Sequence, residues 1–234
     1  AQAYAGTGEN TVNSQKARST KTAAENAQKI VAAHQDEDDY SKLTSYLKEI
    51  CDLVSYNHSA AENPSTPYGD PWQLVYVFDG NQSTNVVCEG YSKAFQYLCD
   101  LSAFEEDIAC YTIYGDLLNA DGSSGGGHMW NTVTMEDGKN YLVDVTNCDG
   151  DEGNYGVGYP DKLFLAGGKE EGSNRWFFTP NGYRVGYEYD EDMVNLYGET
   201  GILELSGEDY HAKLKIPSGL KASYGDKLSS VTLP

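Results

Sequence analysis

Three residues of this sequence have the side-chain types and local settings of a nucleophile, a base and an orienting carboxylate. Cys88 follows an apolar lead-in and opens the amphipathic run Cys-Glu-Gly-Tyr-Ser-Lys-Ala-Phe. His128 follows a glycine-rich segment and begins the run His-Met-Trp-Asn-Thr-Val. Asp144 interrupts the apolar run Tyr-Leu-Val-Asp-Val-Thr. A thiol, an imidazole and a carboxylate brought together are the groups of nucleophilic catalysis by cysteine.

Each setting has a physical reason to favour that chemistry. The positive end of a helix dipole at Cys88 stabilises a thiolate over a thiol, and Gly90 allows close backbone approach beside the sulfur. An imidazole at the start of a strand can take a proton from a thiol on another element. A carboxylate within an apolar strand needs a partner, and the N–H of a histidine is a suitable one.

Taken singly, these residues also have plain structural interpretations. A buried cysteine that opens a helix is as common as a reactive one, and a histidine at a strand start is more often structural. The other three histidines stand in polar or loop contexts and are predicted to be surface residues: His34, His58 and His211. It is the joint occurrence of Cys88, His128 and Asp144 that favours the catalytic interpretation.

The pattern of apolar residues predicts the elements that must position these groups. Helical periodicity indicates helices from Ser14 to Ala33, from the acidic turn at residues 36–39 to about Tyr56, and over residues 88–101. We expect strands, separated by turn signals, at residues 108–114, 128–135, 141–145, 162–166, 176–179, 183–189 and 202–205. Helices followed by strands predict an α+β fold.

Composition limits the function classes. The formal net charge is −20, from 36 acidic and 16 basic residues, which argues against nucleic acid and anionic membranes as partners. No apolar run approaches the length of a membrane span. Five cysteines without zinc-type spacing leave at least one thiol unpaired within the chain, and no metal or other cofactor is expected. The run from Asn147 to Asn154 superficially resembles a calcium loop but lacks its final bidentate glutamate, so an acidic turn is favoured.

The two ends differ from the middle. We predict a disordered lead-in over residues 1–13, one domain over residues 14–214, and a linker with the start of a β-repeat module over residues 215–234. The last stretch resembles the opening of a repeat found on Gram-positive bacterial surface proteins; a boundary inside a longer protein and a disordered tail are the alternatives. The start of the sequence has no signal-peptide features, so either the protein is cytoplasmic or a signal peptide has been removed. The repeat and the composition favour an extracellular or cell-surface location within a longer multidomain protein.

The runs that begin at Cys88 and His128, and the Asp-Val-Thr that begins at Asp144, resemble the transglutaminase-like superfamily over about residues 38–149, and more loosely to residue 205. The resemblance implies a papain-like α+β core, with the cysteine helix packed on an antiparallel sheet that carries the histidine and the aspartate. It further implies that Cys88 is the nucleophile, His128 the general base and acid, and Asp144 the orienting carboxylate.

The segment upstream of the nucleophile, Pro-Trp-Gln-Leu-Val-Tyr over residues 71–76, departs from the usual pattern of that family and leaves the oxyanion donor open. The backbone N–H of Cys88 is one candidate, and Gln73 or Trp72 is a candidate side-chain donor. Both could equally be core or substrate-groove residues, and Trp130 is a further candidate for substrate contact.

The predicted function is attack of the Cys88 thiolate on a peptide or protein amide, with a thioester that water or an amine resolves. Water would make the protein a cysteine peptidase or amidase, which we favour, and a lysine-type amine would make it a protein-crosslinking transglutaminase. A non-catalytic binding or structural module of a bacterial surface protein is the alternative from another class.

Overall fold

The computed structural model describes residues 12–63, 72–81, 83–150 and 162–211. The predicted start of a β-repeat module at residues 215–234, most of the predicted lead-in at residues 1–13, and part of the acidic run at residues 147–154 therefore lie outside the described residues. The single domain predicted over residues 14–214 is described over most of its length.

Helices fill the first half of the chain. They are α1 (Ser14–Ala33), α2 (Asp39–Leu53), α3 (His58–Ala61), α4 (Trp72–Phe78) and α5 (Cys88–Leu101). Side-chain caps fix the starts of the first two, because the Asn13 carboxamide accepts from the N–H groups of Gln15 and Lys16, and the Asp38 carboxylate accepts from Ser41 N. The acidic turn before α2 thus supplies a helix cap, as its sequence indicated.

The second half of the chain forms an antiparallel sheet. Its strands are β1 (Ala109–Leu118), β2 (Ser124–Thr134), β3 (Asn140–Val143), β4 (Phe164–Ala166), β5 (Lys169–Glu170), β6 (Arg175–Phe178) and β7 (Val185–Tyr189). Within the described residues their order across the sheet is β4-β3-β2-β1-β7-β6-β5, and neighbouring strands pair antiparallel. The mixture of helices and antiparallel sheet confirms the predicted α+β class.

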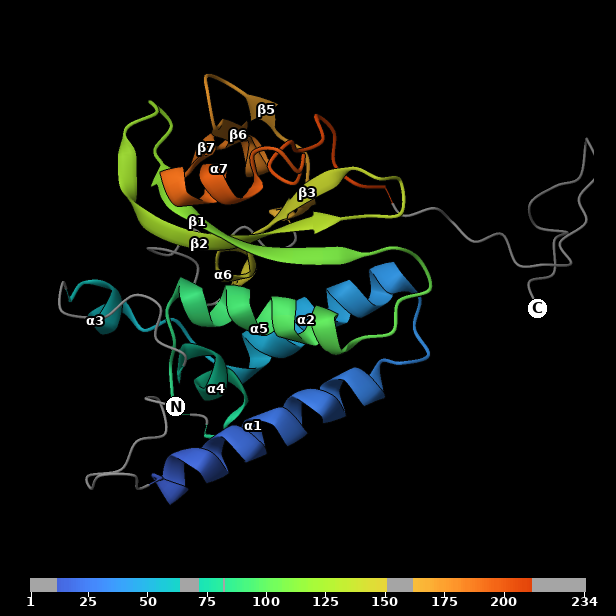
Figure 1. Cartoon of the computed structure of the whole chain (residues 1–234). Coiled ribbons are helices and arrows are strands. Elements are labelled where there is room, and N and C mark those ends of the chain that lie inside the picture. Colours follow the sequence, from blue (N-terminus) through green and yellow to red (C-terminus); the bar gives the residue numbers. More distant parts are fainter. Residues whose placement is uncertain (1–11, 64–71, 82, 151–161, 212–234) are drawn as a thin grey trace, which may run out of the picture.

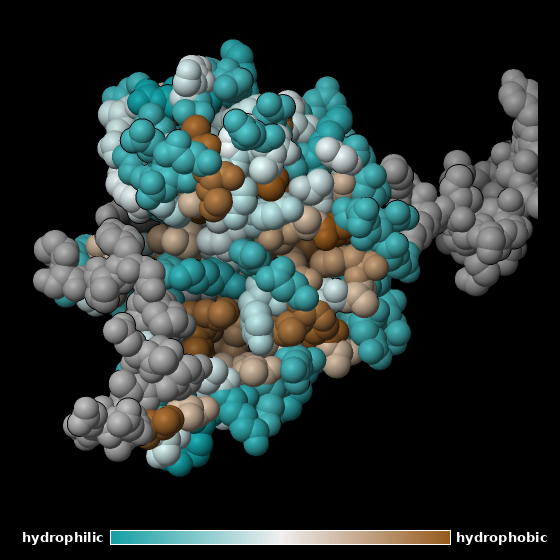
Figure 2. Space-filling model, in the orientation of Figure 1, coloured by the Kyte–Doolittle hydropathy of each residue, from teal (hydrophilic) through white to brown (hydrophobic). Residues whose placement is uncertain are grey.

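The helices and the sheet form layers (Figure 1). Helix α5 lies directly beneath β1 and β2, with α2 and α4 beside it and α1 farther from the sheet, while the short helix α7 (Glu191–Tyr197) covers the opposite side of β1. The core between these layers includes fully buried Tyr46, Phe95, Leu98 and Trp130. Figure 2 shows hydrophilic residues over most of the visible surface, with apolar residues gathered where the helices meet the sheet. The central helix is thereby held between the outer helices and the strands.

Several local predictions differ from the structure. The strand expected at residues 202–205 is a turn that makes one isolated bridge, from Leu205 to Asn140. Asp144 lies one residue beyond the end of β3 and begins the four-residue helix α6 (Val145–Cys148), so it is not within a strand. Helix α7 was not expected, although Asp190 caps it by accepting from Asp192 N at 2.8 Å. No helix in the described ranges has the length and apolar character that crossing a membrane requires.

Candidate active site

Cys88 is the first residue of α5, and two contacts fix where that helix begins. The N–H of Val87, the N-cap residue, donates to the side-chain oxygen of Gln73 on α4 at 3.0 Å. Gly90 lies against the side chain of Val86, so close that a β-carbon on Gly90 would stand 2.5 Å from the β-carbon of Val86. The glycine therefore permits this contact with Val86, and its role in close backbone approach beside the sulfur stays a prediction.

His128 stands on β2 opposite Gly115 of β1, above the start of α5. Its side chain is almost completely buried, its ring hydrogen-bonds the side chain of Asp144, and it is close enough to the Cys88 thiol for that group to help raise the pKa of His128. The bond to Asp144 joins His128 Nε2 to Asp144 Oδ2 at 2.8 Å. Since Nε2 is engaged in this way, Nδ1 is the ring nitrogen left for the thiol of Cys88.

Asp144 is fully buried and caps α6 with one oxygen while the other faces the histidine. Its Oδ1 accepts from Asn147 N at 3.1 Å. Its Oδ2 accepts from His128 Nε2, from Asn147 Nδ2 at 2.7 Å and from the Tyr187 hydroxyl at 2.6 Å. A buried carboxylate that receives several hydrogen bonds is held in its charged form, with its orientation fixed.

These contacts shift the pKa values of His128 and Asp144. Burial disfavours the imidazolium form of His128, but the negative charge and hydrogen bond of Asp144, with a contribution from Cys88, outweigh burial and raise the pKa of His128 to about 10. Burial also works to raise the pKa of Asp144, yet His128, Tyr187 and Asn147 together lower it. An imidazolium between a carboxylate and a thiol is the arrangement that favours a thiolate.

Tyr187 and Asn147 are members of this cluster that sequence reasoning missed. Tyr187 lies on β7, two strands away from His128 across the sheet, and burial followed by the charge of Asp144 raises its pKa well above the ordinary value. The alternating pattern around it predicts an inward-facing side chain, but nothing in the sequence pairs it with Asp144. Asn147 is the third residue after Asp144, the spacing at which a helix cap contacts the chain.

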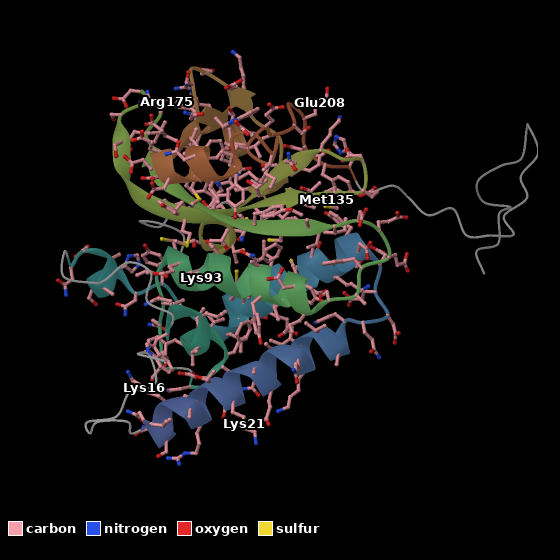
Figure 3. All side chains as sticks on the ribbon, viewed as in Figure 1. Lys16, Lys21, Lys93, Met135, Arg175 and Glu208 are labelled. Carbon is pink, nitrogen blue, oxygen red and sulfur yellow. The ribbon has the colours of Figure 1, made fainter. Side chains whose placement is uncertain are left out.

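Ser92 joins the cysteine helix to the histidine strand. Its hydroxyl lies 2.9 Å from the carbonyl oxygen of Cys88 and 2.8 Å from that of Met129, and its single proton can donate to either. Asn131 of β2 donates in turn to the carbonyl oxygen of Ser92 at 3.0 Å. The positions of Cys88 and His128 are therefore coupled through hydrogen bonds that lie one turn into α5. Figure 3 shows the neighbouring Lys93 on α5, just beneath the strands.

The three further candidates occupy different places. Gln73 is buried and reaches the residue before Cys88, as described above. Trp72 is half-buried at the start of α4, with the ammonium of Lys16 5.0 Å from its ring centroid. Trp130 is fully buried and its ring stacks beside that of His128, with 6.2 Å between centroids, so it packs behind the imidazole. A role for Trp72 or Trp130 in substrate contact stays a prediction.

The side chains that could bind a metal ion do not gather in one place in the part of the chain that the structure describes. In the described ranges, no three side chains of the His, Cys, Asp or Glu type gather as a metal site would require. His58 and His211 are exposed as predicted. His34, also expected at the surface, is partly buried, and its two ring nitrogens contact carboxylates of Glu37 and Glu49 at 2.9 and 3.2 Å.

Comparisons with known proteins add little to this geometry. No protein-family model matches the sequence, and no curated protein does. Among solved structures, the chain is similar to a crystal structure of a TGase, with 17% sequence identity and a TM-score of 0.39 over 60% of this chain and 34% of that chain. The chain thus spans about a third of the length of that protein. A similarity at this level defines neither the fold nor the activity of this chain.

Proposed function

We propose that this protein is a thiol-dependent acyl-transfer enzyme that acts on amide bonds of peptides or proteins. The observation that carries the proposal is the continuous series of contacts from Cys88 through His128 to Asp144, which lie on three different elements. Tertiary structure has to bring these side chains together, and a buried imidazolium between a thiol and a carboxylate has a direct chemical use. A module that only binds a partner has no need of that arrangement.

The chemistry follows from the charges of the three groups. The Cys88 thiolate attacks the amide carbonyl carbon, and the electron pair of the C=O bond moves to oxygen. As the tetrahedral intermediate collapses to a thioester, the His128 imidazolium gives its proton to the leaving amine. The now neutral imidazole takes a proton from water or from a second amine, which attacks the thioester and releases Cys88. Asp144 holds the ring in position and stabilises its charged form.

Gln73 is the side chain best placed to supply an oxyanion donor. Its oxygen is occupied by Val87 N–H, which orients the carboxamide beside the start of α5 and leaves the Nε2 group as a donor near Cys88. The backbone N–H at the beginning of α5 is the second donor, since the first N–H groups of a helix have no partner within it. Together these donors can stabilise the charge that develops on the carbonyl oxygen.

Alkylation of the native protein tests the reactivity of the thiol. Cys51 is the most exposed of the five cysteines and Cys88 is buried, so accessibility alone predicts that iodoacetamide modifies Cys51 first. The proposed thiolate predicts the reverse order, and the replacement His128→Gln should slow the alkylation of Cys88 without affecting Cys51. Mapping of the modified peptides over time gives both rates. A Cys88 that reacts more slowly than Cys51 would overturn the catalytic assignment and favour a non-catalytic module.

A second assay identifies whether water or an amine resolves the thioester. It uses a glutamine-containing peptide in the presence of a dansylated amine. Peptide or amide hydrolysis alone identifies a cysteine peptidase or amidase, which is our proposal, whereas incorporation of the amine identifies a transglutaminase. The Cys88→Ala variant, which lacks the nucleophile, is the control for both reactions. Loss of the thiol must abolish whichever product is found.

Two variants separate the proposed oxyanion-donor role of Gln73 from its structural hydrogen bond with Val87 N–H. Gln73→Glu keeps an oxygen for Val87 N–H but removes the Nε2 donor, so we expect kcat to fall on the order of 10²–10³-fold. Because the new carboxylate is buried, we expect the stability of this variant to fall as the pH rises and the carboxylate ionises. Gln73→Ala removes both and should lose stability as well as activity. Denaturation and steady-state kinetics on the two variants give the comparison, and a Gln73→Glu enzyme of ordinary kcat would exclude Gln73 as the donor.

A further inference from the structure

Two of the cysteines that the proposed mechanism does not use lie against each other. Cys99 is on α5 and Cys110 is at the start of β1, and both are almost completely buried. Both line one cavity between the helix and the strand, and the Cys99 thiol is close enough to add to the effect of burial in raising the pKa of Cys110. All five cysteines of the chain are within the described residues and carry free thiols.

The placement of this pair follows from the register between the helix and the strand. Ser92, Gln96 and Cys99 recur at positions i, i+4 and i+7 and so share one face of α5. On β1, Cys110 and Thr112 are two residues apart and share one face of the strand. Thr112 N donates to the Gln96 side-chain oxygen at 2.9 Å, and the Thr112 hydroxyl lies 3.5 Å from the carbonyl oxygen of Ser92. These bonds fix the same helix face against the same strand face, one and two helical turns before Cys99 and two residues after Cys110.

A cavity gives the pair a route to small reagents. It has a volume of about 370 Å³, lies where α5 ends and β1 begins, and is lined by Cys99 and Cys110 together with Gln96, Phe104 and Ile108. Two cysteines on facing elements form a disulfide when rotation about their Cα–Cβ bonds can bring the sulfur atoms to bonding distance. The pair therefore lies on facing surfaces of α5 and β1 in one cavity, and the cavity admits a small reagent.

We propose that Cys99 and Cys110 are a disulfide-forming pair that, when oxidised, covalently joins the helix of Cys88 to the sheet of His128. The oxidant is a low-molecular-weight disulfide such as oxidised glutathione. One thiolate attacks the reagent, forms a mixed disulfide and releases one reduced thiol. The second cysteine then attacks the protein sulfur and releases another, so the two cysteines lose two electrons and two protons while one reagent disulfide is reduced to two thiols.

The Cys99–Cys110 disulfide would join α5 and β1, which position the candidate active site. Its formation does not depend on whether Cys88 acts as a nucleophile. Helix α5 carries Cys88 at one end and Cys99 near the other, and β1 pairs directly with β2, which carries His128. A covalent link between α5 and β1 constrains the unfolded chain and holds the two layers together. The proposal is therefore independent of the proposed function.

The test is to refold the full chain from denaturant in a glutathione redox buffer, so that the geometry of the fold decides the pairing. Free thiols are then alkylated and the chain is cleaved without reduction on the carboxyl side of glutamate. Because Glu105 and Glu106 lie between Cys99 and Cys110, this cleavage separates the two cysteines. We expect one linked pair of peptides, lighter by two hydrogens than their sum and separated by reduction. The Cys88→Ser variant should give the same pair even if Cys88 has no catalytic role.

Thermal unfolding provides an independent measurement. We expect oxidation to raise Tm by on the order of 5 °C in the native sequence and in Cys88→Ser, and to give no such rise in Cys110→Ser. Cys99 and Cys110 recovered as free thiols, as separate glutathione adducts, or linked to other cysteines would each overturn the proposal. The peptide map of the native sequence decides the matter even if Cys110→Ser fails to fold.

Discussion

At the scale of single residues, Asp144 is the best-supported member of the site, because its partners come from three elements. His128 of β2, Tyr187 of β7 and Asn147 of α6 all donate to one oxygen, within 2.8 Å. Three donors on one carboxylate oxygen spread its charge and keep it ionised in a fully buried place. The tyrosine is the unexpected partner, since a histidine alone would satisfy the simplest form of the triad.

Tyr187→Phe should separate this contribution from ordinary packing. The change removes a hydrogen bond to a charged group, which is worth about 1.5–3 kcal/mol of stability, and it also removes one of the groups that lower the pKa of Asp144. We therefore expect a lower kcat and an acid limb of the activity profile that moves to higher pH. Unfolding in urea and a pH–rate profile measure the two effects.

Tyr189→Phe is the matched control for that variant. Tyr189 stands on the same strand, is equally buried, and donates its hydroxyl to the carbonyl oxygen of Leu203 at 2.9 Å without touching Asp144. It should cost about 1 kcal/mol of stability and leave the acid limb in place. If the two variants shift the pH profile equally, Tyr187 has only a structural role.

At the scale of elements, the start of α5 decides where the thiol lies. Four contacts converge there: Gln73 on Val87, Val86 on Gly90, Ser92 on the carbonyl of Cys88, and His128 on the thiol itself. An error of about 1 Å in this position can lower a rate by 10²-fold. The close contact between Gly90 and Val86 is the one that a single substitution can test.

Gly90→Ala adds a β-carbon where there is no room for it. Its distance of 2.5 Å from the β-carbon of Val86 requires the backbone to move, at a cost of about 1–3 kcal/mol that exceeds the helix propensity of about 1 kcal/mol gained from alanine. We expect lower stability in urea and slower alkylation of Cys88. Gly207→Ala is the control, because no atom lies within 4 Å of its added carbon. Equal effects of the two changes would contradict the packing explanation.

Comparison of the elements shows how much of this arrangement the sequence could predict. The apolar spacing predicts the bounds of α1 and α5 because it is a local signal, and the alternating patterns place the strands of Cys110, His128 and Tyr187 to within a few residues. Tyr187 and Ser92 were missed as site residues because their roles depend on strand order and on the register of α5 against β2, which no local pattern encodes. The turn at residues 202–205 was taken for a strand because a short apolar run does not specify pairing.

At the scale of the whole molecule, the site is a buried charge cluster within a chain whose formal net charge is −20. Electrostatic self-repulsion works against the compact state, and the imidazolium of His128 is a positive charge placed inside it. The stability of the fold and the ionisation of the site are consequently linked. Any pH that removes the proton from His128 also removes the stabilisation that its charge gains mainly from Asp144.

The sign of this linkage gives the pH dependence of unfolding. The pKa of His128 is about 10 in the folded chain and about 6.5 in an unfolded one, so between these values the folded state holds a proton that the unfolded state lacks. The stabilisation is fully present below about pH 6.5 and is lost as the pH rises toward 10, with a slope of up to about 1.4 kcal/mol per pH unit.

Urea unfolding at a series of pH values from 6 to 10 measures that slope. Lysines and tyrosines titrate in the same range, so the comparison is with His128→Gln, which keeps their contributions and removes that of the imidazole. We expect a steeper fall of the unfolding free energy in the native sequence than in the variant, even though the variant is less stable at pH 7 because Asp144 loses its charged partner. Parallel curves would mean that His128 is neutral in the folded protein. The imidazolium needed to stabilise a Cys88 thiolate would then be absent.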